Sequence, residues 1–164
     1  MLVTLLSAWI CPDISTLIAA LVFSACLLAL SQIDVQYQLL PDSLTLTLLW
    51  FGLAWHLLPG PVSLYDAVCG AIAGYLSLWI IFHLFRFITG KEALGYGDFK
   101  LLAALGAWLG WQQLPLLVLI ASIAGIAVSI VVFSRKGYLN KKLAFGPFLS
   151  LAGWFLFFFP YFNH

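Results

Sequence analysis

Residues 16–33 read TLIAALVFSACLLALSQI, eighteen residues in a row without a charged side chain. A helix needs about 20 predominantly apolar residues to cross the hydrocarbon core of a bilayer. This run is close to that length, and Asp34 follows it directly. The stretch therefore predicts a transmembrane helix that ends next to a carboxylate.

Five further apolar runs follow at short intervals, at residues 44–58, 66–85, 98–111, 114–134 and 147–162. The runs at 44–58 and 98–111 are short for a span, which a bilayer accommodates by thinning locally or by flanking residues that reach its surface. Turn-forming residues separate the runs, as in Pro59-Gly60-Pro61 and Gly146-Pro147. The pattern predicts an all-α, polytopic membrane protein of about six transmembrane helices.

Composition independently indicates that lipid surrounds most of this chain. Of its 164 residues, 64% are hydrophobic and 8% are charged, with a mean hydropathy of +1.09. Soluble domains carry about 25% charged residues. A net charge of +1 without a basic stripe argues against a nucleic-acid partner. Cys11, Cys26 and Cys69 form no C-x-x-C pair or zinc-site spacing, so we expect neither a metal nor a cofactor.

Residues 1–15, MLVTLLSAWICPDIS, differ from the rest of the chain. Their apolar stretch is too short to span a bilayer. They also lack the basic start and the small-residue cleavage site of a signal peptide. We expect two parts: an N-terminal interfacial segment at residues 1–15 and a transmembrane domain at residues 16–164.

The basic residues predict the orientation of the six spans. Three loops share one face, at residues 34–43, 86–97 and 135–146, and they contain Arg86, Lys91, Arg135, Lys136, Lys141 and Lys142. The seventh basic residue, Lys100, lies one turn inside the next span. Its side chain could pair with a carboxylate, but we expect it simply to snorkel back to this face. Loops rich in Lys and Arg face the cytoplasm. The sequence therefore predicts that this face is cytoplasmic.

Four of the six acidic residues have a simple structural interpretation. Asp13 and Asp66 precede spans on the opposite face, where a carboxylate caps free N–H groups and complements the helix dipole. Asp42 follows Pro41 just before the second span, a typical signal for a helix start, and capping of that helix explains Asp42 without chemistry. Glu92 lies in a polar loop, and we expect it to be solvated.

Asp34 and Asp98 are less easily explained, because both adjoin apolar runs. Asp34 ends the first run, and Asp98 begins the fourth directly after Gly95-Tyr96-Gly97. An ionisable group at the edge of the hydrocarbon is costly to keep, which favours a functional interpretation. Two carboxylates brought together on the same face can share a proton and activate a water molecule. Each could instead cap a helix at the interface, and spacing alone does not separate these alternatives.

Four short stretches together resemble the type IV prepilin peptidases, polytopic aspartic proteases with a GxGD motif. They are Ile33-Asp34, Leu40-Pro41-Asp42-Ser43-Leu44-Thr45, Gly95-Tyr96-Gly97-Asp98-Phe99-Lys100-Leu101 and Phe145-Gly146-Pro147-Phe148. The similarity covers residues 16–164. It implies that Asp34 and Asp98 form the catalytic pair. It also implies a substrate class, prepilins or type II secretion pseudopilins, whose basic leader is cleaved at the cytoplasmic side of the bacterial inner membrane.

The chain departs from the long members of that family in one respect. Those members carry a cytoplasmic domain with two C-x-x-C pairs and also methylate the new N-terminal residue. Because no such pair occurs here, we expect a short form that lacks N-methyltransferase activity. Two other functions remain as alternatives: a small transporter or channel-like protein with intramembrane carboxylates, and an inactive scaffold for pilus assembly. The sequence does not define an oligomeric state.

Overall fold

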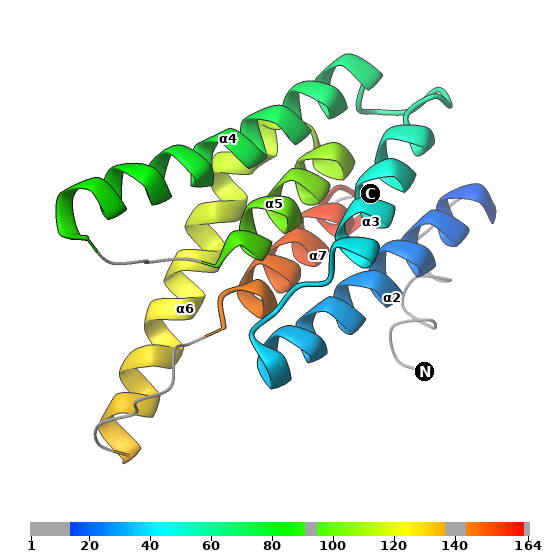
Figure 1. Ribbon diagram of the computed structural model, residues 1–164. Helices are drawn as coiled ribbons and strands as arrows, with labels where there is room; N and C mark the ends of the chain where they lie inside the picture. Colours follow the sequence, from blue (N-terminus) through cyan, green and yellow to red (C-terminus); the bar gives the residue numbers. More distant parts are fainter. Residues whose placement is uncertain (1–13, 91–94, 137–143, 163–164) are drawn as a thin grey trace.

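The computed structural model describes residues 14–90, 95–136 and 144–162. Within these residues the chain is all-α, with six α-helices, one 3-10 turn and no strand (Figure 1). Each helix begins and ends within four residues of its predicted run. The elements are α2 (Ile14–Tyr37), α3 (Asp42–Trp55), α4 (Leu64–Thr89), α5 (Tyr96–Leu109), η1 (Trp111–Gln113), α6 (Leu114–Lys136) and α7 (Gly146–Phe162).

Helix length and apolarity confirm a polytopic membrane protein. α2, α4 and the stretch Trp111–Val131 are long and apolar enough to cross a bilayer. α7 contributes a shorter apolar stretch, Gly146–Phe159. α3 and α5 have 14 residues each, which is about 21 Å of helix. Since the hydrocarbon core is about 30 Å thick, these two helices are shorter than a full span, as the sequence predicts.

Several sequence predictions fall on residues that the structure does not describe. The interfacial segment at residues 1–15 overlaps the described part only at Ile14 and Ser15, which begin α2, and it stays a prediction. Also outside the described residues are Cys11, Asp13, Lys91, Glu92, Lys141 and Lys142.

α5 forms the centre of the bundle, and every residue from Leu101 to Leu109 is buried. α4, α3 and α7 pack around it (Figure 1). The backbones of α4 and α5 touch, because a Cβ atom added to Gly106 would lie 2.2 Å from the carbonyl oxygen of Gly70. Small residues of this kind let membrane helices pack closely without a hydrophobic driving force. The two glycines therefore fix how α4 lies against the central helix.

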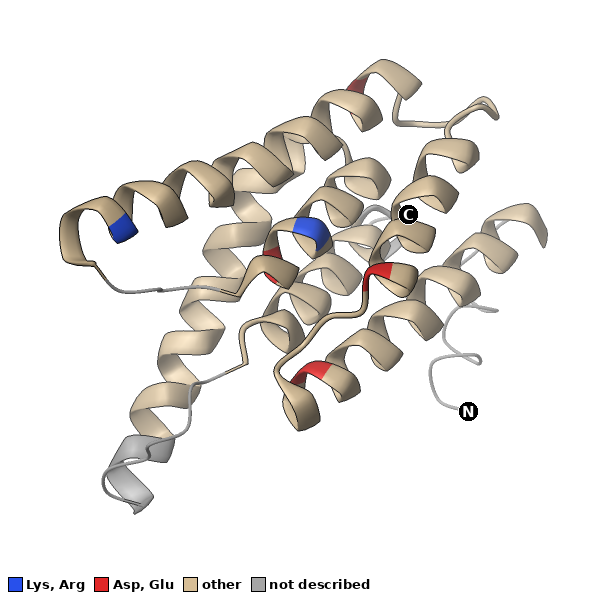
Figure 2. Ribbon diagram, viewed as in Figure 1, with Lys and Arg blue, Asp and Glu red and all other residues tan. Residues whose placement is uncertain are grey.

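The two ends of the helix bundle differ in the chain segments and polar contacts that lie there. In Figure 1 the carboxyl ends of α2, α4 and α6 all lie toward the lower left, and the loop between α3 and α4 lies at the upper right. At that second end Ser63 caps α4, and Asp66 accepts hydrogen bonds from the Ser63 hydroxyl, Trp111 and Gln112. Figure 2 shows few charged positions along the helices. Ser63 and not Asp66 is therefore the cap of α4, whereas Asp66 lies in the first turn, where a carboxylate complements the helix dipole.

Candidate active site

Asp34 lies in the last turn of α2 with only 6% of its surface exposed. Its Oδ2 accepts a hydrogen bond of 2.9 Å from the backbone N–H of Gly146, the first residue of α7. Glycine leaves room for this contact, because a Cβ atom at position 146 would lie 2.5 Å from that oxygen. The Phe145-Gly146-Pro147-Phe148 stretch therefore brings the start of α7 directly onto the Asp34 carboxylate.

Asp98 lies in the first turn of α5 and is also only 6% exposed. Gly95 precedes the helix as its N-cap, and its backbone N–H donates to the Asp98 carboxylate. An acidic side chain three residues after the N-cap commonly reaches back in this way. Asp98 therefore does contact the start of its own helix, which is compatible with either interpretation of this residue, and the same contact orients its carboxylate.

The structure brings the two aspartates together, although 64 residues separate them in sequence. Their carboxylates interact electrostatically, and each aspartate follows or precedes a fully buried apolar residue on its own helix, Leu30 one turn before Asp34 and Phe99 directly after Asp98. Two carboxylates held close together in such surroundings do not both ionise readily and tend to share one proton. We refer to Asp34 and Asp98 as the carboxylate pair.

The connection between α2 and α3 packs onto the first turn of α5. A Cβ atom at Gly97 would lie 2.7 Å from the Cβ of Leu40, so the glycine lets this buried leucine contact the backbone beside Asp98. Gln38, directly after α2, has a φ angle of 53°, a left-handed conformation that interrupts the helix. The two sequence motifs are therefore in direct contact.

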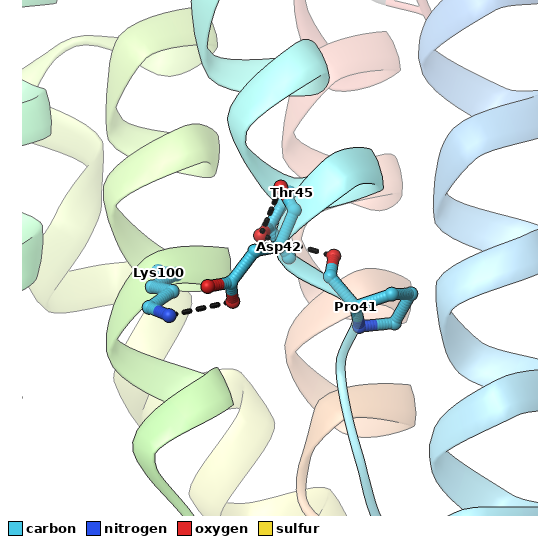
Figure 3. A network of polar contacts seen from close by, with 4 residues as sticks. All are labelled: Pro41, Asp42, Thr45 and Lys100. Atoms are coloured by element: carbon cyan, nitrogen blue, oxygen red, sulfur yellow. Dashed lines mark hydrogen bonds and ion pairs between the residues drawn. The ribbon is translucent and has the colours of Figure 1, made fainter.

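Two sequence-based assignments beside the pair are wrong. Lys100 does not simply snorkel to the surface: its Nζ lies 2.5 Å from Oδ1 of Asp42, in an ion pair that joins α5 to α3 (Figure 3). Asp42 does not cap α3, because Pro41 is the N-cap residue and makes no side-chain cap bond. A local pattern around position 42 or position 100 cannot reveal a partner 58 residues away.

Among the described residues, two hydrogen-bond networks and one unpaired hydroxyl, that of Ser150, lie deeper in the bundle. Nε2 of His56 lies 3.1 Å from the carbonyl oxygen of Trp108, and the Trp108 indole donates to the carbonyl of Leu48. Trp154 likewise donates to the hydroxyl of Ser24. In the described part of the chain, no three His, Cys, Asp or Glu side chains gather as a metal-ligand set. The carboxylate pair is thus the buried acidic centre of the described structure.

Comparison with known proteins assigns the chain to a family. Residues 21–130 match the type IV leader peptidase family. The chain belongs to this family. The matched region includes Asp34, Asp98 and the Asp42–Lys100 ion pair, so the leader peptidase match and the buried centre coincide.

Individual relatives agree with the family assignment. A prepilin leader peptidase/N-methyltransferase of Pectobacterium carotovorum is 58% identical over 137 residues, which are 83% of this chain and 49% of that protein. One from Aeromonas hydrophila is 54% identical over 138 residues, 84% of this chain and 48% of that protein. One from Pseudomonas aeruginosa is 52% identical over 129 residues, which are 78% of this chain and 44% of that protein. The chain spans about half the length of these relatives. No solved structure matches it.

Proposed function

We propose that this chain is a membrane aspartic endopeptidase that removes the basic leader from type IV prepilins or type II secretion pseudopilins. The observation that carries the proposal is the carboxylate pair, buried between helices and formed by the two motifs of a leader peptidase. Relatives that share more than half of the aligned residues are named prepilin leader peptidases. Asp34 and Asp98 are the proposed catalytic residues.

The proposed reaction is general acid–base hydrolysis of one peptide bond. One carboxylate takes a proton from water as the water oxygen attacks the scissile carbonyl carbon. The other carboxyl group, protonated at the start, donates its proton to the carbonyl oxygen. When the tetrahedral intermediate collapses, the C–N bond breaks and the first carboxyl returns its proton to the leaving amine. The second carboxyl regains its own, so the pair ends the cycle with one shared proton.

We propose that cleavage occurs on the cytoplasmic side of the bacterial inner membrane. The loops after α4 and α6 carry basic residues, and these two helices end on the same side of the bundle as α2 (Figure 1). The carboxylate pair lies at the end of α2 and the start of α5, and so belongs to that side. The positive-inside rule then supports a cytoplasmic active site.

We also propose that these 164 residues do not transfer methyl groups. The proposal rests on the sequence, in which no C-x-x-C pair occurs. It is tested by incubating cleaved substrate with the chain and labelled S-adenosylmethionine, and label in the substrate would contradict it.

The peptidase proposal is tested with the purified chain in liposomes. Candidate prepilins and pseudopilins are added, cleavage is followed by gel mobility, and the new N-terminus is sequenced. We expect a shorter product that has lost its basic leader. If no candidate is cut while a relative cuts the same substrates in the same liposomes, the proposed function is wrong.

A further inference from the structure

Asp34 lies on α2 and Asp98 on α5, but neither of these two helices has the other as its main packing partner. α2 packs chiefly against α7 and also contacts α3, whereas α5 packs against α4, α3 and α7. The separation of Asp34 and Asp98 is therefore set largely through α7 and α3. On α7 the link is the Gly146 N–H bonded to Asp34.

On the α3 side, two contacts reach the first turns of α5. Leu40 packs on Gly97, and Asp42 pairs with Lys100 (Figure 3). These contacts flank Asp98 on both sides in the sequence. Thr45 hydrogen-bonds back to the carbonyl oxygens of Pro41 and Asp42, which steadies the start of α3. The first turns of α3 and α5 are thus joined next to the pair.

Exposure indicates that this ion pair has little to do with stability. The side chains of Asp42 and Lys100 are 60% and 32% exposed, and exposed ion pairs contribute little to folding. Catalysis is more sensitive to position, since a displacement of about 1 Å can cost about 100-fold in rate. A contact that is weak for folding can therefore be important for turnover.

We propose that the Asp42–Lys100 ion pair is a positioning contact that holds the first turn of α5, and with it Asp98, at the distance from Asp34 that hydrolysis needs. The role in hydrolysis rests on the proposed peptidase function. Neither residue transfers a proton to the substrate in this proposal. The ion pair acts only through the geometry of the carboxylate pair.

A double-mutant cycle tests the proposal in the liposome assay. Lys100→Met and Asp42→Ala should each lower kcat about tenfold while KM stays within about twofold. The double variant should be no slower than the slower single variant, because the second change removes nothing further. Asp42→Asn, which keeps an oxygen acceptor for the Lys100 ammonium, should restore most of the activity lost in Asp42→Ala.

Asp66→Asn is the matched control, because Asp66 also joins two elements but at the opposite end of the bundle. It should leave kcat unchanged. The proposal is overturned if the effects of Asp42→Ala and Lys100→Met multiply in the double variant. It is also overturned if KM rises at constant kcat. That second result would mean that Asp42 contacts the substrate, beside the shallow hollow on the outer face of α3 to which it contributes.

A cross-linking measurement separates this proposal from the peptidase function. In a chain with Cys11, Cys26 and Cys69 changed to Ser, Asp34→Cys and Asp98→Cys are linked with thiol reagents of graded length. Adding Lys100→Met should shift the reagent length that gives the highest yield. If the yield depends on reagent length in the same way with and without Lys100→Met, the positioning role is overturned, whether or not the unmodified chain cleaves any substrate. A shifted profile upholds positioning, and the peptidase proposal is then rejected separately if the unmodified chain cuts no substrate that a relative cuts in the same liposomes.

Discussion

Both members of the carboxylate pair bind the amide of a glycine at the start of a helix. Asp34 accepts from Gly146 at α7, and Asp98 accepts from Gly95 at α5. Helix N-termini attract negative charge, which offsets part of the cost of placing carboxylates among apolar side chains. Each aspartate therefore has a backbone-holding role besides its proposed role in proton transfer, and substitution can separate the two.

Asparagine at either position keeps an oxygen that accepts the glycine N–H but does not take part in proton transfer. We expect Asp34→Asn and Asp98→Asn each to lower kcat about 100- to 10,000-fold, the usual contribution of a general acid or base. Membrane insertion and thermal unfolding should remain as in the unmodified chain. Normal processing of a prepilin by either variant would remove that residue from the mechanism.

Gly146→Ala tests whether the contact between α7 and Asp34 sets the position of the carboxylate. The added methyl group would lie 2.5 Å from Oδ2 of Asp34, so the carboxylate must move. We expect kcat to fall about 10- to 100-fold, because small displacements of reacting groups are costly.

Gly60→Ala is the control for that variant, since a Cβ atom there has only one neighbour, a carbonyl oxygen at 3.9 Å. It should leave both kcat and thermal unfolding unchanged. Equal effects of the two substitutions would show that the loss comes from alanine itself and not from the contact with Asp34.

At the level of residues, the sequence predicts which aspartates are unusual but not what holds them. Asp34 and Asp98 stand out because charge beside an apolar run is rare, and the structure places both in one buried centre. Gly146 and Lys100 carry no comparable local signal. Their partners, Asp34 and Asp42, lie 112 and 58 positions away, so only the tertiary structure pairs them.

At the level of elements, the apolar runs predict each helix to within four residues because lipid requires continuous hydrogen-bonded helix. The largest differences are at carboxyl ends. α2 continues to Tyr37, beyond the predicted end at Ile33, because Asp34 faces the bundle interior and finds a partner there. The contact between α4 and α5 is marked in the sequence by glycines spaced four apart, at Gly70 and Gly74 and at Gly106 and Gly110, a pattern common where membrane helices touch.

Gly106→Leu tests that helix contact. Its side chain would meet the Gly70 carbonyl on a rigid backbone, so α4 and α5 must separate. We expect the free energy of unfolding in detergent to fall by about 1–3 kcal/mol, as for other overpacked interiors.

Gly125→Ala provides the comparison, because its Cβ atom would make ordinary contacts, the nearest at 3.7 Å from Phe148. Its unfolding should be close to that of the unmodified chain. If Gly106→Leu is equally stable, the close approach of α4 and α5 is not a stabilising feature of the bundle.

At the level of the whole molecule, the Lys and Arg residues of the loops predict which face of the protein is cytoplasmic. The positions of the helix ends predict which loops lie on the same face. Epitope tags inserted after residues 60 and 90 test both in oriented vesicles. The tag after residue 90 should be cut by an added protease only from the cytoplasmic side, and the tag after residue 60 only from the other. Accessibility of both tags from one side would rule out the six-span topology.

An aspartic mechanism also predicts that the whole molecule works without a metal. Cleavage in liposomes should survive EDTA at concentrations that inactivate a metallopeptidase run in parallel. Loss of activity with EDTA, restored by a divalent cation, would contradict the proposed roles of Asp34 and Asp98.

The hydrogen bond between Asp34 and Gly146 joins the first and the last helix that the structure describes, and this has a consequence for how the protein is made. A ribosome adds about 5–20 residues per second, so the 112 residues between the two take roughly 6–22 seconds to synthesise. During that time α2 can already be in the bilayer, but its carboxylate has no amide to bind. Because α7 must be inserted before Asp34 is held in place, the nascent chain cannot fix both members of its carboxylate pair until α7 has been made.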